Sequence, residues 1–327
     1  MNKVLIVSNS LDAHADEIER RLQKHSFPVV RLNTDKFMSE CIKLHFQCDI
    51  KQSYLEINGV QNNLYDFVSI LYRRPEQLET GVTDSYQKVF AEKESGELLK
   101  QLYQIPLPVL WVSRLDSLKV ARRKLPQLLT AKRLGMNIPK TIVTNSPEEV
   151  RCFFRECDGR MIYKTLNSPI IRLGEGPELW GVPTTLLKEE QLQSIHLIQK
   201  TGGIFQEYVD KLYEVRVTVI GNDIFAAMIH SQLEESAKID WREAVALNLV
   251  RVEPYKLPDF VENQCRSVVY SYGLKFGAID LIRRKDGSYV FLELNCNGQW
   301  LWVEERTGQP LLESMVRLLT NLYKERR

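Results

Sequence analysis

Two alternating runs near the C-terminal end of the chain place two acidic side chains opposite one another. Asp286-Gly287 separates these runs and is a strong signal for a β-hairpin. A two-residue loop there fixes the register, so that Asp280 faces Glu293, and Asn295 projects from the same face. Carboxylates paired in this way have Cβ atoms about 5 Å apart and repel each other. Three oxygen-bearing side chains on one face suit Mg²⁺, and the alternative is a wet sheet face on which the charges spread apart.

The same register assigns the other side chains of the hairpin. It places Leu281 opposite Leu292. We therefore expect a buried underside made of Ile279, Leu281, Val290, Leu292 and Leu294. Cys296 follows the proposed ligand Asn295, but Mg²⁺ prefers oxygen to sulfur, so we expect Cys296 to be structural.

An upstream segment offers a second set of charged groups. Glu214, Arg216 and Thr218 alternate with three valines, so one face of this predicted strand is apolar and the other carries an acid, a base and a hydroxyl. The segment is either an ordinary half-exposed strand or part of the same site as the acidic hairpin.

Two lysines have positions that suit phosphate binding. Lys164 ends an apolar strand just before a glycine-containing loop, and Lys124 sits just before Pro126. A lysine at a strand end is usually a solvated charge. Beside a metal and a mobile loop, it could instead hold phosphate oxygens.

Composition narrows the class of protein. At 327 residues the chain is long enough for two or three domains, and its 44% hydrophobic content supports compact cores. The net charge of +2 does not suggest general nucleic-acid binding. The N-terminal residues read as a strand rather than a signal peptide, and no apolar run approaches the roughly 20 residues needed to span a membrane. The cysteines show no zinc spacing, so we expect reduced thiols in a cytoplasmic protein.

The order of predicted elements indicates an α/β protein with three regions. Residues 1–115 are expected to form an N-terminal α/β domain, since a strand at 3–8, a helix at 12–25 and a strand at 28–33 make a βαβ start. The first turn contains no glycine, which argues against a dinucleotide site.

The second and third regions contain the candidate site residues. Residues 116–201 form a central region with a helical segment broken near Pro126, a left-handed cap at Gly135 and a long irregular loop from Leu166 to Thr185. Residues 202–327 form a C-terminal region with several strands, a helix at 259–272, the acidic hairpin and a final helix.

In this order, the elements resemble the ATP-grasp ligases across nearly the whole chain. The family pattern of a lysine, a later glycine and then Pro-x-Thr resembles Lys124 followed by Gly135-Met-Asn-Ile-Pro139-Lys-Thr141. The second family lysine resembles Lys164, and the adenine hinge resembles Phe205-Gln-Glu-Tyr-Val209. The resemblance implies an ATP-grasp architecture, with a pre-ATP-grasp domain followed by central and C-terminal ATP-grasp domains.

The resemblance also implies a role for each candidate residue, with ATP and a pair of Mg²⁺ ions as cofactors. Asp280, Glu293 and Asn295 would bind Mg²⁺, and Lys124 and Lys164 would hold the α- and β-phosphates. Glu214 would bind the ribose, and Arg216 would stabilise the transferred phosphoryl group. The residues that would meet adenine, partly through backbone groups, are Gln206, Glu207, Tyr208 and Val209.

Within the superfamily the chain looks most like the macrocyclases of microviridin-type peptides, the graspetides. The segments that carry this resemblance are Leu71-Tyr-Arg-Arg-Pro75, His230-Ser-Gln, Ile239-Asp-Trp-Arg242 and Gly298-Gln-Trp-Leu-Trp-Val-Glu-Glu-Arg-Thr-Gly308. The implied partner is a ribosomal precursor peptide whose leader docks on the central domain. The implied reaction phosphorylates a core Asp or Glu side chain with ATP and joins it to a Ser or Thr hydroxyl or a Lys amine. The product is a lactone or a lactam.

Several assignments stay open at this level. Arg242 either orients the substrate carboxylate as a catalytic residue or stacks on Trp241 at the surface. The pair Arg73-Arg74 is either a contact from the N-terminal domain to the active site or a domain-interface pair. No general base stands out, and homodimer formation is not resolved.

Two other functions also remain open. An ATP-grasp ligase that adds an amino acid to a small molecule or a protein end would need the same nucleotide machinery. A catalytically silent peptide-binding module would not need the intact acid pair, both lysines and Arg216.

Overall fold

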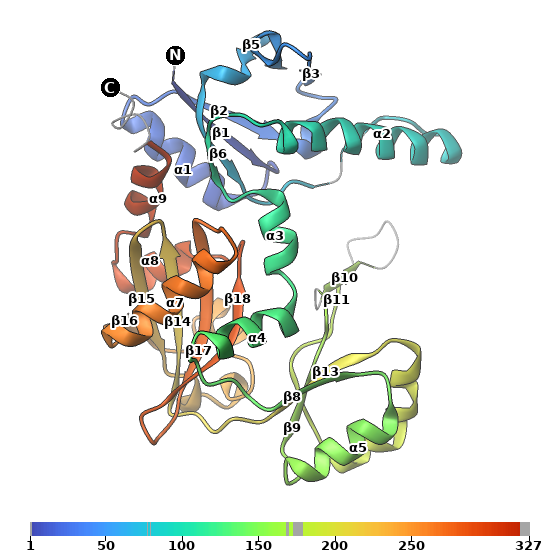
Figure 1. Ribbon diagram of the computed structural model, residues 1–327, viewed down its shortest axis with the longest axis vertical. Helices are drawn as coiled ribbons and strands as arrows, with labels where there is room; N and C mark the ends of the chain where they lie inside the picture. The colour runs from blue at the N-terminus through green and yellow to red at the C-terminus, as the bar shows by residue number, and fades with distance from the viewer. Residues whose placement is uncertain (1, 77, 79, 168–169, 173–178, 321–327) are drawn as a thin grey trace.

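The computed structural model describes residues 2–76, 78, 80–167, 170–172 and 179–320. Over these residues the chain forms three successive units, each built around its own β-sheet (Figure 1). The architecture is the mixed α/β arrangement that the sequence predicts. Within the described ranges, no helix combines the length and the apolar character needed to cross a membrane.

A four-stranded parallel sheet forms the centre of the N-terminal unit. Its strands, in spatial order, are β2 (Val29–Asn33), β1 (Lys3–Ser8), β6 (Phe67–Tyr72) and β7 (Leu110–Val112). Helices cover both faces, as a parallel sheet requires. Helix α1 (Ala13–Lys24) packs on the Val4 and Ile6 face, and α2 (Ser85–Gln104) packs on the Leu5 and Val7 face.

Smaller elements complete this unit. An antiparallel sheet contains β3 (Lys43–His45), β4 (Tyr54–Ile57) and β5 (Val60–Asn63). Short 3-10 turns occur here at Thr34–Lys36, Ile50–Gln52 and Leu64–Asp66, and in the C-terminal unit at Ser231–Leu233 and Glu235–Ala237.

Two helices, α3 (Leu115–Ala121) and α4 (Lys124–Arg133), lead away from the N-terminal unit (Figure 1). The expected break at Pro126 is wrong in position, because the helical run stops at residues 122–123 and Pro126 lies in the first turn of α4. A proline is tolerated in a first turn, where its missing N–H would have no helical partner. The expected left-handed residue after α4 is confirmed, since Gly135 has a φ of +80°.

Among its described residues, the central unit is an antiparallel sheet with one α-helix. The strand order is β12 (Thr185–Leu187), β9 (Met161–Lys164), β13 (Gly203–Glu207) and β8 (Thr141–Thr144), with α5 (Pro147–Glu156) and a 3-10 helix at Glu189–Lys200 alongside. Strand β13 lies beyond the sequence boundary at residue 202, yet it pairs with β8 and β9 of this sheet.

The predicted irregular loop from residue 166 to 185 contains regular structure. Strands β10 (Ile170–Arg172) and β11 (Leu179–Gly181) pair there as an antiparallel hairpin. Gly174 and Gly176 lie outside the described residues.

The C-terminal unit is a five-stranded antiparallel sheet with helices on both faces. Its strand order is β16 (Val252–Tyr255), β15 (Asp223–Ile229), β14 (Tyr213–Ile220), β17 (Phe276–Arg283) and β18 (Tyr289–Asn295). Its helices are α6 (Arg242–Ala246), α7 (Asp259–Ser271), α8 (Leu301–Thr307) and α9 (Leu311–Thr320). Helices α4 and α7 contribute to the core on one face, and α9 packs between this unit and α1.

The acidic hairpin departs from the predicted register at two places. The loop has three residues, since the N–H of Arg284 donates to the carbonyl of Ser288 at 2.9 Å, and this pairs Arg283 with Tyr289 and Leu281 with Phe291. A β-bulge at Leu292 then restores the register, so Asp280 faces Glu293 as predicted.

The longer loop makes the predicted underside of the hairpin partly wrong. Phe291 belongs to the core with Ile279, Leu281 and Leu294. Val290 and Leu292 instead pack with Val209 and Ile282 on the opposite face. The expected pairing of Leu281 with Leu292 is therefore wrong.

Candidate active site

Strand β14 supplies a charged face that pairs with the acidic hairpin. Arg216 lies opposite Asp280 in the sheet, and its Nη1 atom donates to Asp280 Oδ1 at 2.8 Å. Both residues are buried, with 3% and 4% of their surface exposed, and Glu214 is equally buried at 4%. This burial excludes the ordinary half-exposed strand at Glu214–Thr218. On the hairpin face Asp280 is buried, Glu293 is half-buried and Asn295 is exposed.

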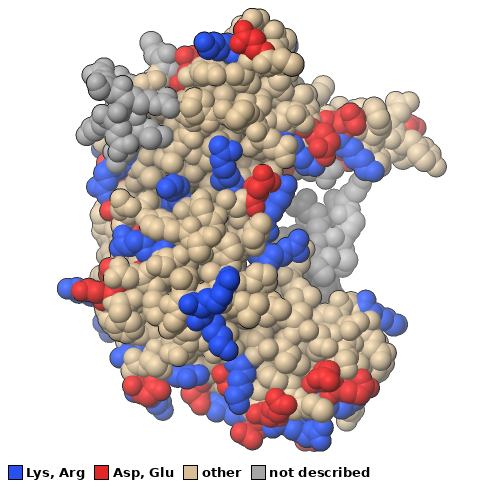
Figure 2. Space-filling model, in the orientation of Figure 1, with Lys and Arg blue, Asp and Glu red and all other residues tan. Residues whose placement is uncertain are grey.

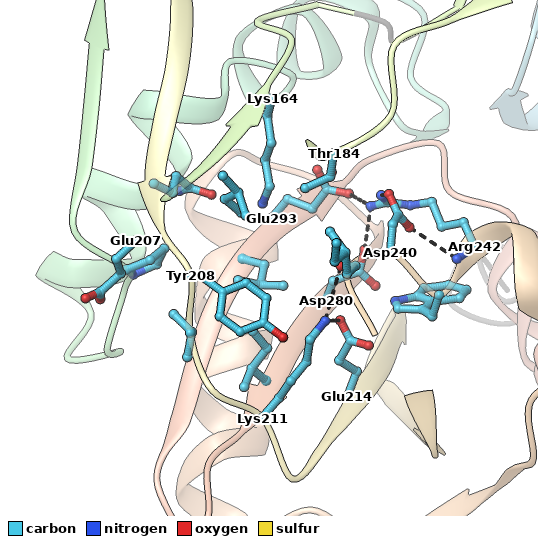
Figure 3. A pocket seen from close by; sticks show the side chains of 18 residues that line it. Lys164, Thr184, Glu207, Tyr208, Lys211, Glu214, Asp240, Arg242, Asp280 and Glu293 are labelled. Atoms are coloured by element: carbon cyan, nitrogen blue, oxygen red, sulfur yellow. Dashed lines mark hydrogen bonds and ion pairs between the residues drawn. The ribbon is translucent and has the colours of Figure 1, made fainter. Parts of the chain in front are cut away.

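A second arginine holds the two carboxylates together. Arg242 donates from Nη2 to Asp280 Oδ2 at 3.3 Å and also to Glu293, while its Nη1 bonds Asp240 Oδ2 at 2.9 Å (Figure 3). The Arg242 guanidinium also lies 5.8 Å from the centre of the Trp241 ring. The opposed acids therefore do not spread apart but converge on one positive group.

The two acids differ in their protonation behaviour. Burial tends to raise the pKa of Glu293, but the charges of Arg242, Lys164 and Lys124 outweigh it and hold this pKa at about 2. Burial raises the pKa of Asp280 above its ordinary value, although Arg216 and Arg242 oppose the shift. Glu293 is thus fixed as a carboxylate at neutral pH.

The two predicted lysines approach Glu293 from different elements. Lys164 extends from the end of β9 into the cavity beside Glu293 (Figure 3). Burial lowers the pKa of Lys164 to about 8, and burial also lowers the pKa of Lys124. Lys124 begins α4 and donates to the carbonyl of Thr165, the residue after Lys164.

Helix α4 is fixed against the acidic strand by one side chain. Gln127 donates from Nε2 to the carbonyl of Leu294 at 2.8 Å, and its Oε1 accepts from the N–H of Leu294 at 2.9 Å. These two hydrogen bonds satisfy the backbone N–H and carbonyl of Leu294 on the edge strand β18. They also fix Lys124, which lies one helical turn before Gln127.

A cavity lies between the central and C-terminal sheets, with apolar side chains on its walls and charged side chains at one end. Such a lining suits a ligand that has an apolar part and a charged part. Most of the predicted residues line it, namely Lys164, Gln206, Glu207, Tyr208, Val209, Glu214, Arg242, Asp280 and Glu293. Apolar walls come from Pro139, Ile162, Trp241, Ile282 and Leu292.

The predicted hinge residues contribute in different ways. The Gln206 side chain donates to the Thr141 hydroxyl at 2.9 Å, and its Oε1 has no hydrogen-bond partner among the described residues. The Glu207 side chain points away from the cavity (Figure 3) and accepts from the N–H of Lys140 at 3.0 Å. The backbone N–H groups of Glu207 and Tyr208 already donate to carbonyls, so these two donors are not free for a ligand.

Lys211 is a cavity residue that sequence reasoning missed. Its Nζ donates to Glu214 Oε1 at 2.8 Å and to the carbonyl of Ile239 at 3.2 Å. Burial raises the pKa of Glu214, and the neighbouring Lys211 charge opposes that shift. In the sequence, Lys211 is marked only by its position, three residues before Glu214 and just ahead of the strand that carries it.

A second and larger cavity opens beside Glu293. Glu293 lines both cavities, whereas Lys124 and Asn295 line only the second. Arg216 lines neither, and its Nη2 instead donates to the carbonyl of Gln299 at 3.2 Å. The second cavity is lined by four separate parts of the chain: Asn9, Tyr72–Glu76, the segment with Arg122, Lys124 and Gln127, and Glu293–Asn297.

The acid pair offers hard oxygen donors that suit Mg²⁺. Both carboxylates already converge on one cation, the Arg242 guanidinium. Among the described residues, no group of three or more His, Cys, Asp or Glu side chains could hold a metal. Mg²⁺ is commonly held by one or two carboxylates together with phosphate oxygens, so this set fits a nucleotide-bound ion.

Comparison with known families divides the chain into two matched segments. Residues 3–118 match the family model of the MvdD pre-ATP grasp domain. Residues 121–319 match the RimK-like ATP-grasp domain.

Solved structures are similar over nearly the whole chain. The macrocyclase MdnC from Microcystis aeruginosa, bound with the precursor peptide MdnA, is 28% identical with a TM-score of 0.85, covering 97% of this chain and 99% of that one. A RiPP-associated ATP-grasp ligase from Chryseobacterium gregarium, in complex with ADP and a leader and core peptide, is 27% identical with a TM-score of 0.87, covering 98% and 97%.

The curated relatives carry a different name. A protein of Chromohalobacter salexigens described as "Probable alpha-L-glutamate ligase" is 24% identical over 208 residues, which are 62% of this chain and 64% of that protein. The chain therefore spans less than two thirds of the length of this relative. Taken with the two matched segments, the comparisons show that the chain belongs to the RimK-like ATP-grasp family and carries an MvdD-type pre-ATP-grasp domain.

Proposed function

We propose that this protein is an ATP-dependent macrocyclase of a ribosomal precursor peptide. Similarity to MdnC and to the Chryseobacterium ligase over nearly the whole chain supports this function. The observation that carries it is the position of Glu293 between two cavities, one suited to a nucleotide and one lined by basic side chains.

The first cavity would hold ATP. Its apolar walls and the strand β13 hinge would receive adenine, and Glu214 at the far end would bind the ribose hydroxyls. Lys164 in this cavity and Lys124 at the adjoining edge of the second cavity would hold the α- and β-phosphates, since the charge of Glu293, which lines both cavities, acts on both ammonium groups. Gln206 has one unpaired buried oxygen that an adenine amino group could satisfy.

The acidic hairpin would bind magnesium at the phosphate end. Asp280, Glu293 and Asn295 would be the protein ligands, with phosphate oxygens completing the coordination. Bound Mg²⁺ neutralises negative charge on the terminal phosphates during transfer. Arg242 would be released from both carboxylates when the metal binds, and its guanidinium would then orient the substrate carboxylate. Arg216, fixed by Asp280, would stabilise the transferred phosphoryl group.

The proposed reaction has two balanced steps. An oxygen of a core Asp or Glu carboxylate bonds to the γ-phosphorus while the bond from that phosphorus to the bridging oxygen breaks, and ADP leaves. A Ser or Thr hydroxyl, or a Lys amine, then attacks the acyl phosphate and displaces phosphate, losing one proton. The acyl phosphate supplies the driving force that ester formation in water lacks.

The experiment combines the protein with ATP, Mg²⁺ and the peptide encoded by a neighbouring small reading frame rich in Thr, Ser, Asp and Glu. Mass spectrometry should show the loss of one water per crosslink, matched by ADP release. An unchanged peptide mass with no ADP above background would contradict the proposal.

A second candidate function follows from the curated relatives. A ligase that adds glutamate to a protein end or a small molecule would use the same nucleotide site. The two functions differ in the product, because glutamate addition increases the mass of the acceptor whereas cyclisation decreases it. Free glutamate added to the same incubation therefore separates them.

A further inference from the structure

The second cavity lies where a phosphoryl acceptor must approach. It meets the nucleotide cavity at Glu293, and its other walls come from the end of β6, the start of α4 and the end of β18. In phosphoryl transfer the attacking and leaving oxygens lie roughly in line on opposite sides of phosphorus. A nucleotide in the first cavity would therefore direct its γ-phosphate toward a carboxylate that enters from the second.

The charge of the second cavity suits an acidic substrate. Its basic residues are Arg73, Arg74, Arg122 and Lys124. Its carboxylates are Glu76 and Glu293, and Glu293 is already bound to Arg242. Figure 2 shows Lys and Arg side chains gathered across the middle of one face of the molecule, at the level of α3 and α4 in Figure 1.

Arg74 and Arg122 are the two guanidinium groups of this cavity with no ion pair to a described carboxylate. Both residues are exposed. Arg73, by contrast, is buried and bonds Asp12 Oδ2 at 3.1 Å, so it serves as an anchor. Arg122 lies beside the thiol of Cys296, which is an uncharged group.

The backbone that presents Arg74 is firmly held. Asn9 donates from Nδ2 to the carbonyl of Arg74 at 2.7 Å, and Asn297 donates from Nδ2 to the carbonyl of Arg73 at 2.6 Å. The first bond lies within the N-terminal unit, and the second links that unit to the segment just after the acidic strand. The Arg74 side chain is therefore displayed from a fixed base beside Asn295, as a binding residue requires.

We propose that Arg74 and Arg122 form the subsite that receives the acidic segment of the substrate and selects a carboxylate over an amide. The inference rests on the proposed function and adds the residues that recognise the acceptor. A guanidinium donates in a planar fork that matches a carboxylate, whereas an amide offers one oxygen and no charge. The subsite also reduces the repulsion between an acidic peptide and the phosphates of ATP.

The test uses a fluorescein-labelled peptide of sequence Thr-Glu-Glu-Asp-Thr and its Thr-Gln-Gln-Asn-Thr analogue, each titrated with the full chain in the presence of Mg²⁺ and ADP. Fluorescence anisotropy reports binding. We expect the wild type to prefer the acidic peptide, and Arg74→Gln or Arg122→Gln to reduce that preference about fivefold to tenfold. Arg74→Lys should retain part of it, since the charge remains.

Arg133→Gln is the matched control, because Arg133 lies exposed on α4 but outside both cavities. It should leave the preference unchanged, and ADP affinity should be the same in all variants. An equal affinity of the wild type for both peptides would overturn the subsite, as would equal losses in the control and the two cavity variants.

The outcomes separate this inference from the proposed function. If the wild type crosslinks its precursor and both Arg variants keep the wild-type KM for it, the subsite is wrong while the function stands. If the arginine-dependent preference is found but no crosslink or ADP forms, the function is wrong while the subsite stands.

Discussion

The Nε2 atom of His14, on α1, accepts a hydrogen bond at 2.9 Å from the backbone N–H of Trp300, which precedes α8. The same nitrogen accepts from the N–H of Leu301 at 3.2 Å. The imidazole must therefore be neutral, with its proton on Nδ1, 3.6 Å from Asp12 Oδ1. A side chain of the N-terminal unit thus caps a helix of the C-terminal unit.

This contact predicts a dependence of stability on pH. Burial, helped by the charge of Arg73, lowers the pKa of His14 from 6.5 to about 3, although Asp12 opposes the shift. As pH falls, the His14 imidazole of the unfolded chain is protonated near pH 6.5, well before that of the folded chain. The contribution of His14 to the free energy of unfolding is therefore complete above pH 6.5 and is lost as the pH falls toward 3. The free energy of unfolding should fall by up to about 1.4 kcal/mol per pH unit from this group.

Urea unfolding between pH 7.5 and pH 5 measures this slope. His14→Gln should be less stable at pH 7.5 but should show a shallower decline. An identical slope in the variant would exclude His14 as the titrating group.

Removing the charge of Glu293 should weaken metal-dependent nucleotide binding. Glu293→Gln keeps the size of the side chain but gives up a carboxylate ligand, so the gain in ADP affinity on adding Mg²⁺ should shrink at least about tenfold. Isothermal titration with and without Mg²⁺ measures that gain. Glu94→Gln, on the exposed surface of α2, is the control and should behave as wild type. A normal Mg²⁺ effect in Glu293→Gln would remove this residue from the metal site.

Lys164 should make metal-free ADP binding sensitive to pH. Burial lowers the pKa of Lys164 to about 8, against the attraction of Glu293, so its charge is present below pH 8 and is lost above it. ADP affinity in EDTA should therefore fall between pH 7 and pH 9.5 in the wild type. Lys164→Arg should hold its affinity across this range, and Lys164→Gln should be weak throughout. A flat wild-type profile would place the Lys164 ammonium away from the phosphates.

Gly298 should be intolerant of a side chain. A Cβ atom there would lie 2.6 Å from Arg216 Nη2 and 2.8 Å from the Cβ of Ala278. Gly298→Ala should therefore displace Arg216 or the strand beneath it and destabilise the fold by about 1–3 kcal/mol. Gly96→Ala is the matched control, because nothing lies within 4 Å of its Cβ position on α2.

Thermal unfolding distinguishes the two glycine variants. Gly96→Ala should raise stability by about 1 kcal/mol, since alanine favours a helix. A Gly298→Ala protein as stable as wild type would mean that the Arg216 side chain has room to move.

Local periodicity predicts part of the site, since alternation sets Arg216 apart from its apolar neighbours. The predicted pair of Asp280 and Glu293 is also present, but only because the bulge at Leu292 offsets a loop that is one residue longer than predicted. The same reasoning could not find the Leu292 bulge, because an inserted residue leaves no trace in a pattern of mixed apolar residues.

Other features depend on contacts between distant segments. Arg242 reaches the acid pair from a stretch with no regular period, so its bonds to Asp280 and Glu293 are visible only in the fold. The second cavity combines residues near positions 9, 73, 122 and 295, and no local pattern connects them. Strand β13 could not be assigned to the central sheet by sequence, because its neighbours β8 and β9 are fixed by long-range pairing.

The extra residue in strand β18 also has a chemical effect. In a regular strand, Phe291 would point into the core, Leu292 away from it, and Glu293 back into the core. Because the bulge adds one residue, Leu292 and Glu293 lie on the same face, so a dry surface beside Ile282 stands next to a carboxylate. Deleting Leu292 would leave the two acids facing each other but would expose the base-binding wall to water, so the affinity for ATP would fall more than the affinity for the metal.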